Sequence, residues 1–151
     1  INDDELFISE IIWILWPGGI ALITTPNIKM TLTRNPWHIR EYTSKQLRDL
    51  CEKYFSSVEV NGISGNEKVI KYYNQNLDSV QRFKKLDVFN LEKRLPNFIY
   101  KIPYEILNRM NRNNLKKNDD KLVSSITYKD YELVKDSPTN LDLFLVLRKN
   151  K

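Results

Sequence analysis

One short segment of the chain holds most of the side chains that could carry out chemistry. It contains His38, the only histidine of the 151 residues, together with Trp37, Arg40, Glu41 and Tyr42. An imidazole titrates near neutral pH, so His38 is a candidate general base that could take a proton from a hydroxyl or an amine. The competing interpretation is structural: His38 would fix its own segment by hydrogen bonds to the backbone, with Glu41 as a further partner.

The remaining polar and aromatic residues of this segment are predicted to bind a ligand rather than to react with it. Trp37 could stack on a substrate or on a cation, or could pack the segment against the protein. Arg34 and Arg40 could hold an anionic group through bidentate contacts, or could carry ordinary surface charge. Glu41 and Tyr42 could orient the segment or touch the substrate. Tyr42 also stands where a hydrophobic staple would precede the next helix.

The residues before this segment are predicted to place it at the end of a strand. Apolar residues recur at helical spacing over residues 6–15, with Asp3 or Asp4 as the helix cap. Residues 20–25 are apolar without alternation, which is typical of a strand covered on both faces in a parallel sheet. Asn27 follows the carboxyl end of this strand, where open α/β sheets bind ligands. In the alternative interpretation Asn27 is a turn residue after a proline.

The segment is followed by a helix and further strands. A loop over residues 28–42 leads to a helix over residues 43–55, which starts with a capping box and has a continuous apolar face. Residues 57–63 alternate as a half-exposed strand, so residues 20–63 are predicted to form a strand, loop, helix and strand that cross over within a parallel sheet. Residues 141–147 are predicted to form the last strand.

Between the last two strands the pattern becomes helical. Apolar residues recur at helical spacing over residues 69–73, 77–90 and 98–110, which predicts three helices. Residues 116–121 carry no apolar side chain and are predicted to form a mobile loop.

Two motifs resemble those of class I S-adenosylmethionine-dependent methyltransferases. The first is Leu-Trp-Pro-Gly-Gly at residues 15–19, preceded by Phe-Ile-Ser-Glu at residues 7–10 and followed by a strand and Thr-Pro-Asn at residues 25–27. The second is His-x-x-Glu-Tyr-Thr at residues 38–43, a pattern common before a helix in one broad branch of that family. The resemblance implies an α/β fold, in which this chain is the C-terminal part of a seven-stranded, mostly parallel Rossmann-like sheet with a helical insertion.

The resemblance also implies a domain layout. Residues 1–64 and 122–151 would belong to the core, with the last strand antiparallel beside residues 57–63, and residues 65–121 would form an inserted helical cap over the substrate. The half that binds S-adenosylmethionine is expected upstream of Ile1, because none of the four glycines forms a Gly-x-Gly loop. Without that half the chain alone is expected to be inactive. The open sheet edge predicts that the chain aggregates, dimerises or requires the missing half.

The activity implied by the resemblance is methyl transfer to a small-molecule or sugar-linked acceptor. His38 would be the possible base, and the acceptor would be bound by Asn27, Trp37, Arg40, Glu41 and Tyr42. Two alternatives stay open: an RNA-directed methyltransferase that uses the basic, aromatic-rich insertion, and a non-catalytic interaction module on the same scaffold. The helical spacing of the aromatic residues favours core packing over RNA binding.

Composition limits the other classes. The net charge of +5 comes from charges of both signs scattered along the chain, which is typical of a solvated surface and permits nucleic-acid binding without requiring it. With one cysteine and one histidine, no structural metal site is expected; Cys51, Trp13 and Trp16 are predicted to be packing residues. No apolar run reaches the ~18 residues of a membrane helix and no signal peptide is visible, so a cytoplasmic location is expected.

Overall fold

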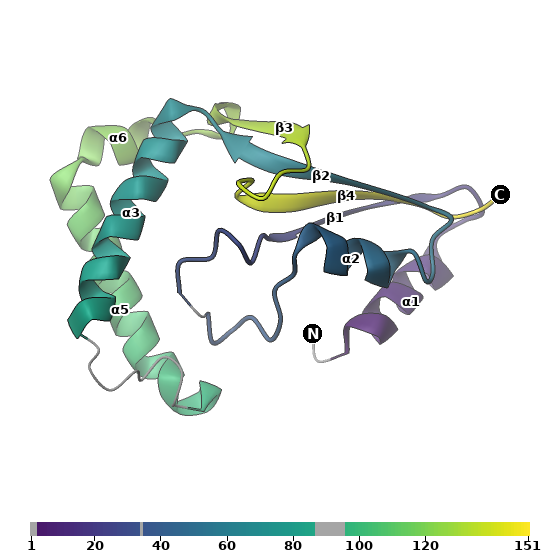
Figure 1. Ribbon diagram of the computed structural model, residues 1–151, viewed down its shortest axis with the longest axis horizontal. Coiled ribbons are helices and arrows are strands. Elements are labelled where there is room, and N and C mark those ends of the chain that lie inside the picture. Colours follow the sequence, from purple (N-terminus) through teal and green to yellow (C-terminus); the bar gives the residue numbers. More distant parts are fainter. Residues whose placement is uncertain (1–2, 34, 87–95) are drawn as a thin grey trace. The chain divides into compact units, whose positions relative to one another are not determined.

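The structure is a computed structural model that describes residues 3–33, 35–86 and 96–151 (Figure 1). Contacts divide the chain into two units. The first unit comprises residues 1–31, 39–64 and 132–151, and the second unit comprises residues 32–38 and 65–131.

The first unit combines a sheet with helices: α1 (Asp4–Ile14), β1 (Ile20–Pro26), α2 (Ser44–Cys51), β2 (Ser57–Gly65), β3 (Tyr131–Lys135) and β4 (Asp142–Arg148). The second unit is helical: α3 (Glu67–Leu86), α5 (Asn97–Asn118), α6 (Asp120–Ser125) and the 3-10 helix η1 (Tyr128–Asp130). The predictions of strands at residues 20–25, 57–63 and 141–147, and of a helix that starts after Thr43, are therefore confirmed.

The sheet has the strand order β1-β4-β2-β3 (Figure 1). β4 is antiparallel to both β1 and β2, so Leu145 lies opposite Ile23 on one side and Val60 on the other. β1 and β2 run in the same direction but do not pair, because the last strand of the chain lies between them. The predicted seven-stranded, mostly parallel Rossmann-like sheet is therefore wrong: the described residues form an α/β fold with a four-stranded, fully antiparallel sheet.

The central position of β4 follows from its sequence. Leu143, Leu145 and Leu147 alternate with the other residues of the strand, and all three are fully buried. A strand with neighbours on both edges can pair its backbone groups on both sides and bury one complete face. The pairing of β4 beside β2, antiparallel as expected, is confirmed.

β1 is covered on one face only, which corrects a second expectation. Its burial alternates along the strand, although its sequence does not. Ala21 and Ile23 pack against the core, whereas Leu22 is 64% exposed and Ile20 is also exposed. β1 is an edge strand within the described sheet, so the apolar run of residues 20–25 does not indicate burial on both faces.

Both helices of the first unit lie on the same side of the sheet (Figure 1). Ile8 of α1 and Leu47, Leu50 and Cys51 of α2 join the leucines of β4 in one hydrophobic core. Asp3 caps α1 through its Oδ1, which accepts from the Leu6 N–H at 2.9 Å. The predicted capping box at the start of α2 is confirmed, with both reciprocal contacts between Thr43 and Gln46 present.

Of the three residues that were predicted to pack in the core, one is buried and two are exposed. Cys51 is fully buried, as expected. Trp13 and Trp16 are 83% and 84% exposed, so the prediction that they pack is wrong in this structure. Both tryptophans follow the last residues of α1 that reach the core, and their side chains meet solvent there.

The helices of the second unit are longer and less interrupted than the sequence pattern predicted. α3 is a single helix of 20 residues where two were predicted, and residues 87–90 of the second predicted helix lie outside the described part of the chain. Residues 116–121 are mostly helical, at the end of α5 and the start of α6, so the predicted loop is wrong. The Asp119 side chain caps α6 by accepting from the Leu122 N–H, which explains how a fully polar stretch stays helical.

Polar contacts fix the second unit internally. Asn111 of α5 is buried, donates to Asn76 Oδ1 at 2.6 Å and accepts from the Ser79 hydroxyl, so its amide joins α5 to α3. Asp130 accepts from the Thr127 N–H, from Lys68 and from Asn66, which holds its pKa well below the usual range. Both residues are therefore structural.

Within the described residues, none of the helices is both long and apolar enough to cross a membrane.

Cys51 provides a test of this core. Its thiol is fully buried, and burial raises its pKa to about 11. Because the thiolate is the reactive form, we expect labelling by an aromatic disulfide reagent at pH 8 to be at least about 100-fold slower in the native chain than in denaturant. Equal labelling rates in the two conditions would contradict the packing of α2 on the sheet.

Candidate functional site

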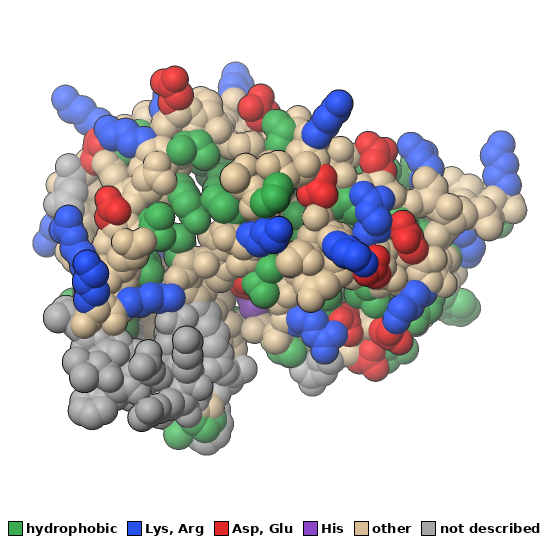
Figure 2. All heavy atoms as spheres, viewed as in Figure 1, with side chains coloured by type: hydrophobic (Ala, Val, Ile, Leu, Met, Phe, Trp, Pro, Cys, Tyr) green, Lys and Arg blue, Asp and Glu red, His purple; other side chains and the backbone are tan. Residues whose placement is uncertain are grey.

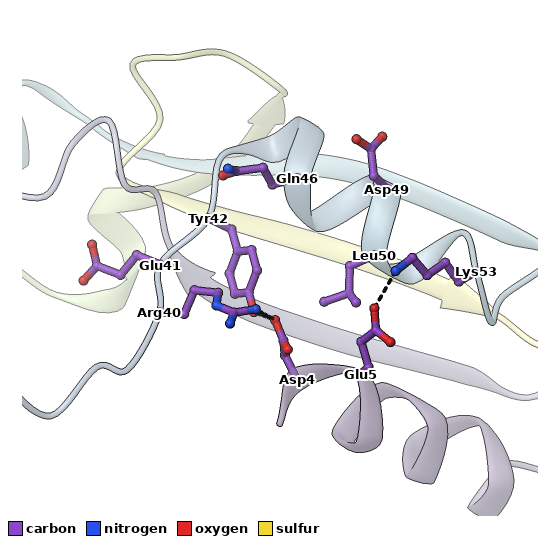
Figure 3. A pocket seen from close by; sticks show the side chains of 9 residues that line it. All are labelled: Asp4, Glu5, Arg40, Glu41, Tyr42, Gln46, Asp49, Leu50 and Lys53. Atoms are coloured by element: carbon purple, nitrogen blue, oxygen red, sulfur yellow. Dashed lines mark hydrogen bonds and ion pairs between the residues drawn. The ribbon is translucent and has the colours of Figure 1, made fainter. Parts of the chain in front are cut away.

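A groove on the first unit has a volume of about 490 Å³ (Figure 3). Three stretches of chain line it, and its lining residues are Asp4, Glu5, Arg40, Glu41, Tyr42, Gln46, Asp49, Leu50 and Lys53. Asp4 and Glu5 come from the first turn of α1, and the next three residues come from the segment before α2. The last four come from α2 and the turn that follows it.

Local sequence explains why these side chains converge. Thr43 starts α2, so Gln46, Asp49, Leu50 and Lys53 follow at spacings of three, four and seven residues and occupy one face. Asp3 fixes the start of α1 and thereby directs the two carboxylates of its first turn toward α2 (Figure 3). The starts of α1 and α2 therefore determine which side chains lie on two sides of the groove.

The segment that carries Arg40, Glu41 and Tyr42 is tied to the end of β1. The Ile28 N–H donates to the Tyr42 carbonyl at 3.1 Å, and Asn27 and Tyr42 form an isolated parallel bridge. Glu41 is held from the same side, because its Oε2 accepts from the Thr31 hydroxyl. The segment therefore continues the sheet for one residue before it enters α2.

One carboxylate, that of Asp4, joins the walls of the groove. Its Oδ2 accepts hydrogen bonds from the Tyr42 hydroxyl and from the Arg40 guanidinium (Figure 3). The Tyr42 hydrogen bond, together with Arg40, lowers the pKa of Asp4. Burial, reinforced by the Asp4 carboxylate, raises the pKa of Tyr42 to about 12. Tyr42 is therefore a neutral hydrogen-bond donor at physiological pH.

Most charged side chains of the groove form ion pairs, but the groove is lined by more carboxylates than cations. Four carboxylates and two cations line it. Lys53 pairs with Glu5, and Lys45 pairs with Asp49 from outside the groove at 2.6 Å. These exposed pairs contribute little to stability, but they fix where donors and acceptors lie. The combination of carboxylates, an amide and a phenol suits a small molecule that bears hydroxyl or amino groups, and suits a strongly anionic one less well.

The six predicted site residues have different surroundings. Arg40, Glu41 and Tyr42 line the groove. Asn27 is only 2% exposed; its amide group donates to the carbonyls of Asn140 (2.8 Å) and Pro138 (3.2 Å), and its Oδ1 accepts from the Lys29 N–H. The side chain of Asn27 thus joins the end of β1 to the turn before β4.

Trp37 and His38 belong to the second unit. Trp37 is 56% exposed, and Lys101 Nζ lies 3.9 Å from the centre of its ring, a cation–π contact. The His38 side chain is exposed, and its backbone N–H donates to the Asn35 carbonyl at 3.0 Å. Arg34 lies outside the described residues.

Sequence reasoning missed most of the groove. From the sequence, Asp4 is expected only as a possible helix cap, although Asp4 holds two of the predicted site residues. The apolar face of α2 was predicted from the sequence, but the polar face that lines the groove was not. The spacing of Gln46, Asp49 and Lys53 was the available signal, because such residues must share a face.

Among residues 3–33, 35–86 and 96–151, no group of three or more His, Cys, Asp or Glu side chains is placed to hold a metal ion.

Removing either partner of the contact between Asp4 and Tyr42 should destabilise the first unit and change its pH dependence. For Asp4→Asn and Tyr42→Phe we expect a loss of about 1.5 kcal/mol at pH 7, the usual value of a hydrogen bond to a charged group. The lowered pKa of Asp4 means that its contribution is present above its unfolded pKa and is lost as the pH falls. Denaturant unfolding between pH 2 and pH 7 should therefore show a smaller acid loss in Asp4→Asn than in the wild type.

The alkaline side tests the same contact independently. A Tyr42 pKa of about 12 means that Tyr42 stabilises the fold while it is protonated, and that this contribution is lost as the pH rises from about 10 toward 12. The difference in ultraviolet absorbance between the wild type and Tyr42→Phe isolates this phenol from the other tyrosines. If Asp4→Asn leaves the difference titration unchanged, the contact does not exist in solution.

Asn27→Asp should be strongly destabilising, because it places a carboxylate oxygen against two carbonyl oxygens in a buried site. We expect a loss of about 2–4 kcal/mol in denaturant unfolding. The matched control is Asn74→Asp on the exposed face of α3, which should change stability by less than about 0.5 kcal/mol. A similar small effect of both substitutions would mean that Asn27 does not join the two segments.

Comparison of the chain with family models, with curated proteins and with solved structures finds no match. A function for the groove must therefore be argued from its own residues and from the two motifs.

Proposed function

We propose that this chain supplies the acceptor-binding side of an S-adenosylmethionine-dependent methyltransferase that acts on a small-molecule or sugar-linked acceptor. One observation carries the proposal: the His-x-x-Glu-Tyr-Thr motif lines a groove together with the first turn of the helix that leads into the Leu-Trp-Pro-Gly-Gly motif. The helix that precedes Pro-Gly-Gly contributes Asp4 and Glu5, and the His-x-x-Glu-Tyr-Thr segment contributes Glu41 and Tyr42. Nothing in the spacing along the chain requires the start of this helix and the second motif to meet.

One strand pairing agrees with the resemblance, although the sheet of the described residues is not the seven-stranded, mostly parallel one that the resemblance implied. The resemblance places an antiparallel last strand beside residues 57–63, and β4 is antiparallel beside β2. Tyr42 of the second motif is held at the carboxyl end of β1 by the bridge to Asn27.

The groups in the groove suit the task of binding an acceptor. Methyl transfer requires the acceptor atom to be held close to the methyl donor in a fixed orientation. Glu41 and Asp49 can accept hydrogen bonds from hydroxyl or amino groups of an acceptor. The proposal retains His38 of the second unit as the candidate base and assigns it no position relative to the groove.

The sequence does not fit a complete cofactor site. S-adenosylmethionine would supply the methyl group, but none of the four glycines belongs to a Gly-x-Gly loop. We therefore assign no cofactor contact to residues of this chain, and the proposed role of the described residues is confined to the acceptor.

Calorimetric titration with S-adenosylhomocysteine tests this division of roles. We expect no saturable binding to this chain at micromolar concentrations, because its glycines supply no Gly-x-Gly loop. Tight binding to the chain would overturn the division.

The acceptor role is tested by variants of the active protein assayed with radiolabelled cofactor. Glu41→Gln and Asp49→Asn should raise the KM for the acceptor about tenfold, the value of one or two hydrogen bonds, with an unchanged affinity for S-adenosylhomocysteine. Glu132→Gln, an exposed change on β3, is the control and should leave both quantities unchanged. Unaltered acceptor KM in both groove variants would exclude the groove as the acceptor site. Activity on RNA that falls steeply with salt would support the RNA-directed alternative instead.

A further inference from the structure

The α5 helix of the second unit carries an apolar stripe that is largely exposed. Ile99, Ile102, Ile106 and Met110 follow one another at spacings of three and four residues, so their side chains share one face of the helix. They are 44%, 68%, 55% and 49% exposed. At the rise of an α-helix the stripe is about 17 Å long. Exposed aliphatic side chains in a continuous row mark a surface that binds something apolar.

A different side of α5 holds the helix within its unit. Asn111 and Leu115 are only 7% and 5% exposed, and the Asn111 amide bonds to Asn76 and Ser79 of α3. With 3.6 residues in each turn, Asn111 and Leu115 lie about 120° to 160° around the helix from Ile99. The stripe is therefore not the surface through which α5 packs on α3.

Basic side chains lie between the stripe and the packed side. The residues of α5 include five cations and one carboxylate, namely Lys101, Arg109, Arg112, Lys116 and Lys117, with Glu105. The first four cations fall within about 80° of the helix circumference, directly beside the stripe. Figure 2 shows Lys and Arg side chains along the surface of the helices of the second unit.

These cations are not neutralised by the chain itself. Arg109, Arg112 and Lys116 are exposed, and none of the three forms an ion pair with another described residue. Lys101 is held differently, over the ring of Trp37. One side of the stripe therefore presents unpaired positive charge, which is complementary to an anionic surface.

We propose that α5 binds the surface of an anionic lipid bilayer and lies in the plane of that surface. A helix with an apolar face and a basic polar face binds in this way, with its apolar side chains at the boundary between headgroups and acyl chains. Ile102 and Ile106 enter that boundary. Arg109 and Arg112, to the side of the stripe, lie at the level of the lipid phosphates, where each cation adds to the affinity.

The chemistry of the stripe favours lipid over RNA, the other anionic partner. Single-stranded RNA is bound by aromatic rings on which its bases stack, and the stripe offers isoleucine and methionine instead. Aliphatic side chains gain little beside a phosphate backbone, but they are stabilised among acyl chains. The half of the protein that the resemblance places upstream would complete the sheet of the first unit, so it gives this face of the second unit no occupant.

Sedimentation of the intact chain with vesicles tests the proposal without any substitution. We expect binding to vesicles of phosphatidylcholine mixed with phosphatidylserine to be at least about tenfold tighter than to phosphatidylcholine alone, and to weaken as salt is added. Equal binding to the two kinds of vesicle, or binding to neither, would overturn the proposal. So would binding to single-stranded RNA by a chain that ignores both vesicles.

Paired substitutions test the two parts of the surface separately. Ile102→Gln combined with Ile106→Gln removes apolar area without changing charge, and should weaken binding to the anionic vesicles at least about tenfold. Arg109→Gln combined with Arg112→Gln should weaken it by a similar factor. The matched controls on β3, Leu133→Gln (61% exposed in the wild type) and Lys135→Gln, should bind as the wild type does. An unchanged far-ultraviolet circular dichroism spectrum shows that a variant is folded.

A fluorescent label shows which face meets the lipid. Cys51 is buried, so a polarity-sensitive thiol reagent will label Ile106→Cys selectively in the native chain. Its emission should shift to the blue on anionic vesicles, whereas the same label on Leu133→Cys should not respond. Unaltered binding in the isoleucine variant, or a shift at position 133 and none at position 106, would contradict the assignment to α5. None of these outcomes depends on methyl transfer.

Discussion

The burial of three leucines on the last strand holds the first unit together. Leu143, Leu145 and Leu147 are fully buried, and each lies opposite a residue of β1 and a residue of β2. Burying such side chains contributes about 2 kcal/mol each. Because β1 and β2 pair only through β4, the sheet cannot form until residues more than a hundred positions apart have met. This long-range closure is the constraint on which the site depends.

The pairing of β1 with β4 determines the geometry of the groove. Asn27 joins the end of β1 to the turn before β4 through two carbonyls, and the bridge to Tyr42 extends the order to the segment before α2. Asp4 then connects this segment to α1 through Tyr42 and Arg40. A chain of polar contacts thus runs from the central strand to the candidate site.

Local features of the fold could be predicted from the sequence, because their causes are local. The capping box of Thr43 and Gln46 and the apolar face of α2 lie within one or two turns of chain. The strands were identified by short apolar or alternating runs bounded by turn residues. The pattern of apolar and polar residues along a strand does not show which other strand pairs with it. The lack of alternation in residues 20–25 therefore suggested a parallel sheet, whereas the structure has an exposed edge.

The candidate site was predicted in part, for the same reason. Arg40, Glu41 and Tyr42 were found through a motif, which is a local signal. Asp4 was missed because its partners lie 36 and 38 residues away, and no pattern in one sequence links such positions. Trp13 and Trp16 were expected to pack because large aromatic residues usually do. In the structure both are exposed, as Leu22 is.

The insertion of β4 between β1 and β2 is the central claim, and proton NMR tests it directly. In an antiparallel pair the residues that do not exchange hydrogen bonds have Cα atoms about 4.5 Å apart, so their Hα protons give strong nuclear Overhauser effects. The structure predicts such effects between Leu22 and Val146 and between Thr24 and Phe144. Effects that connect β1 directly to β2, with none between β1 and β4, would contradict it.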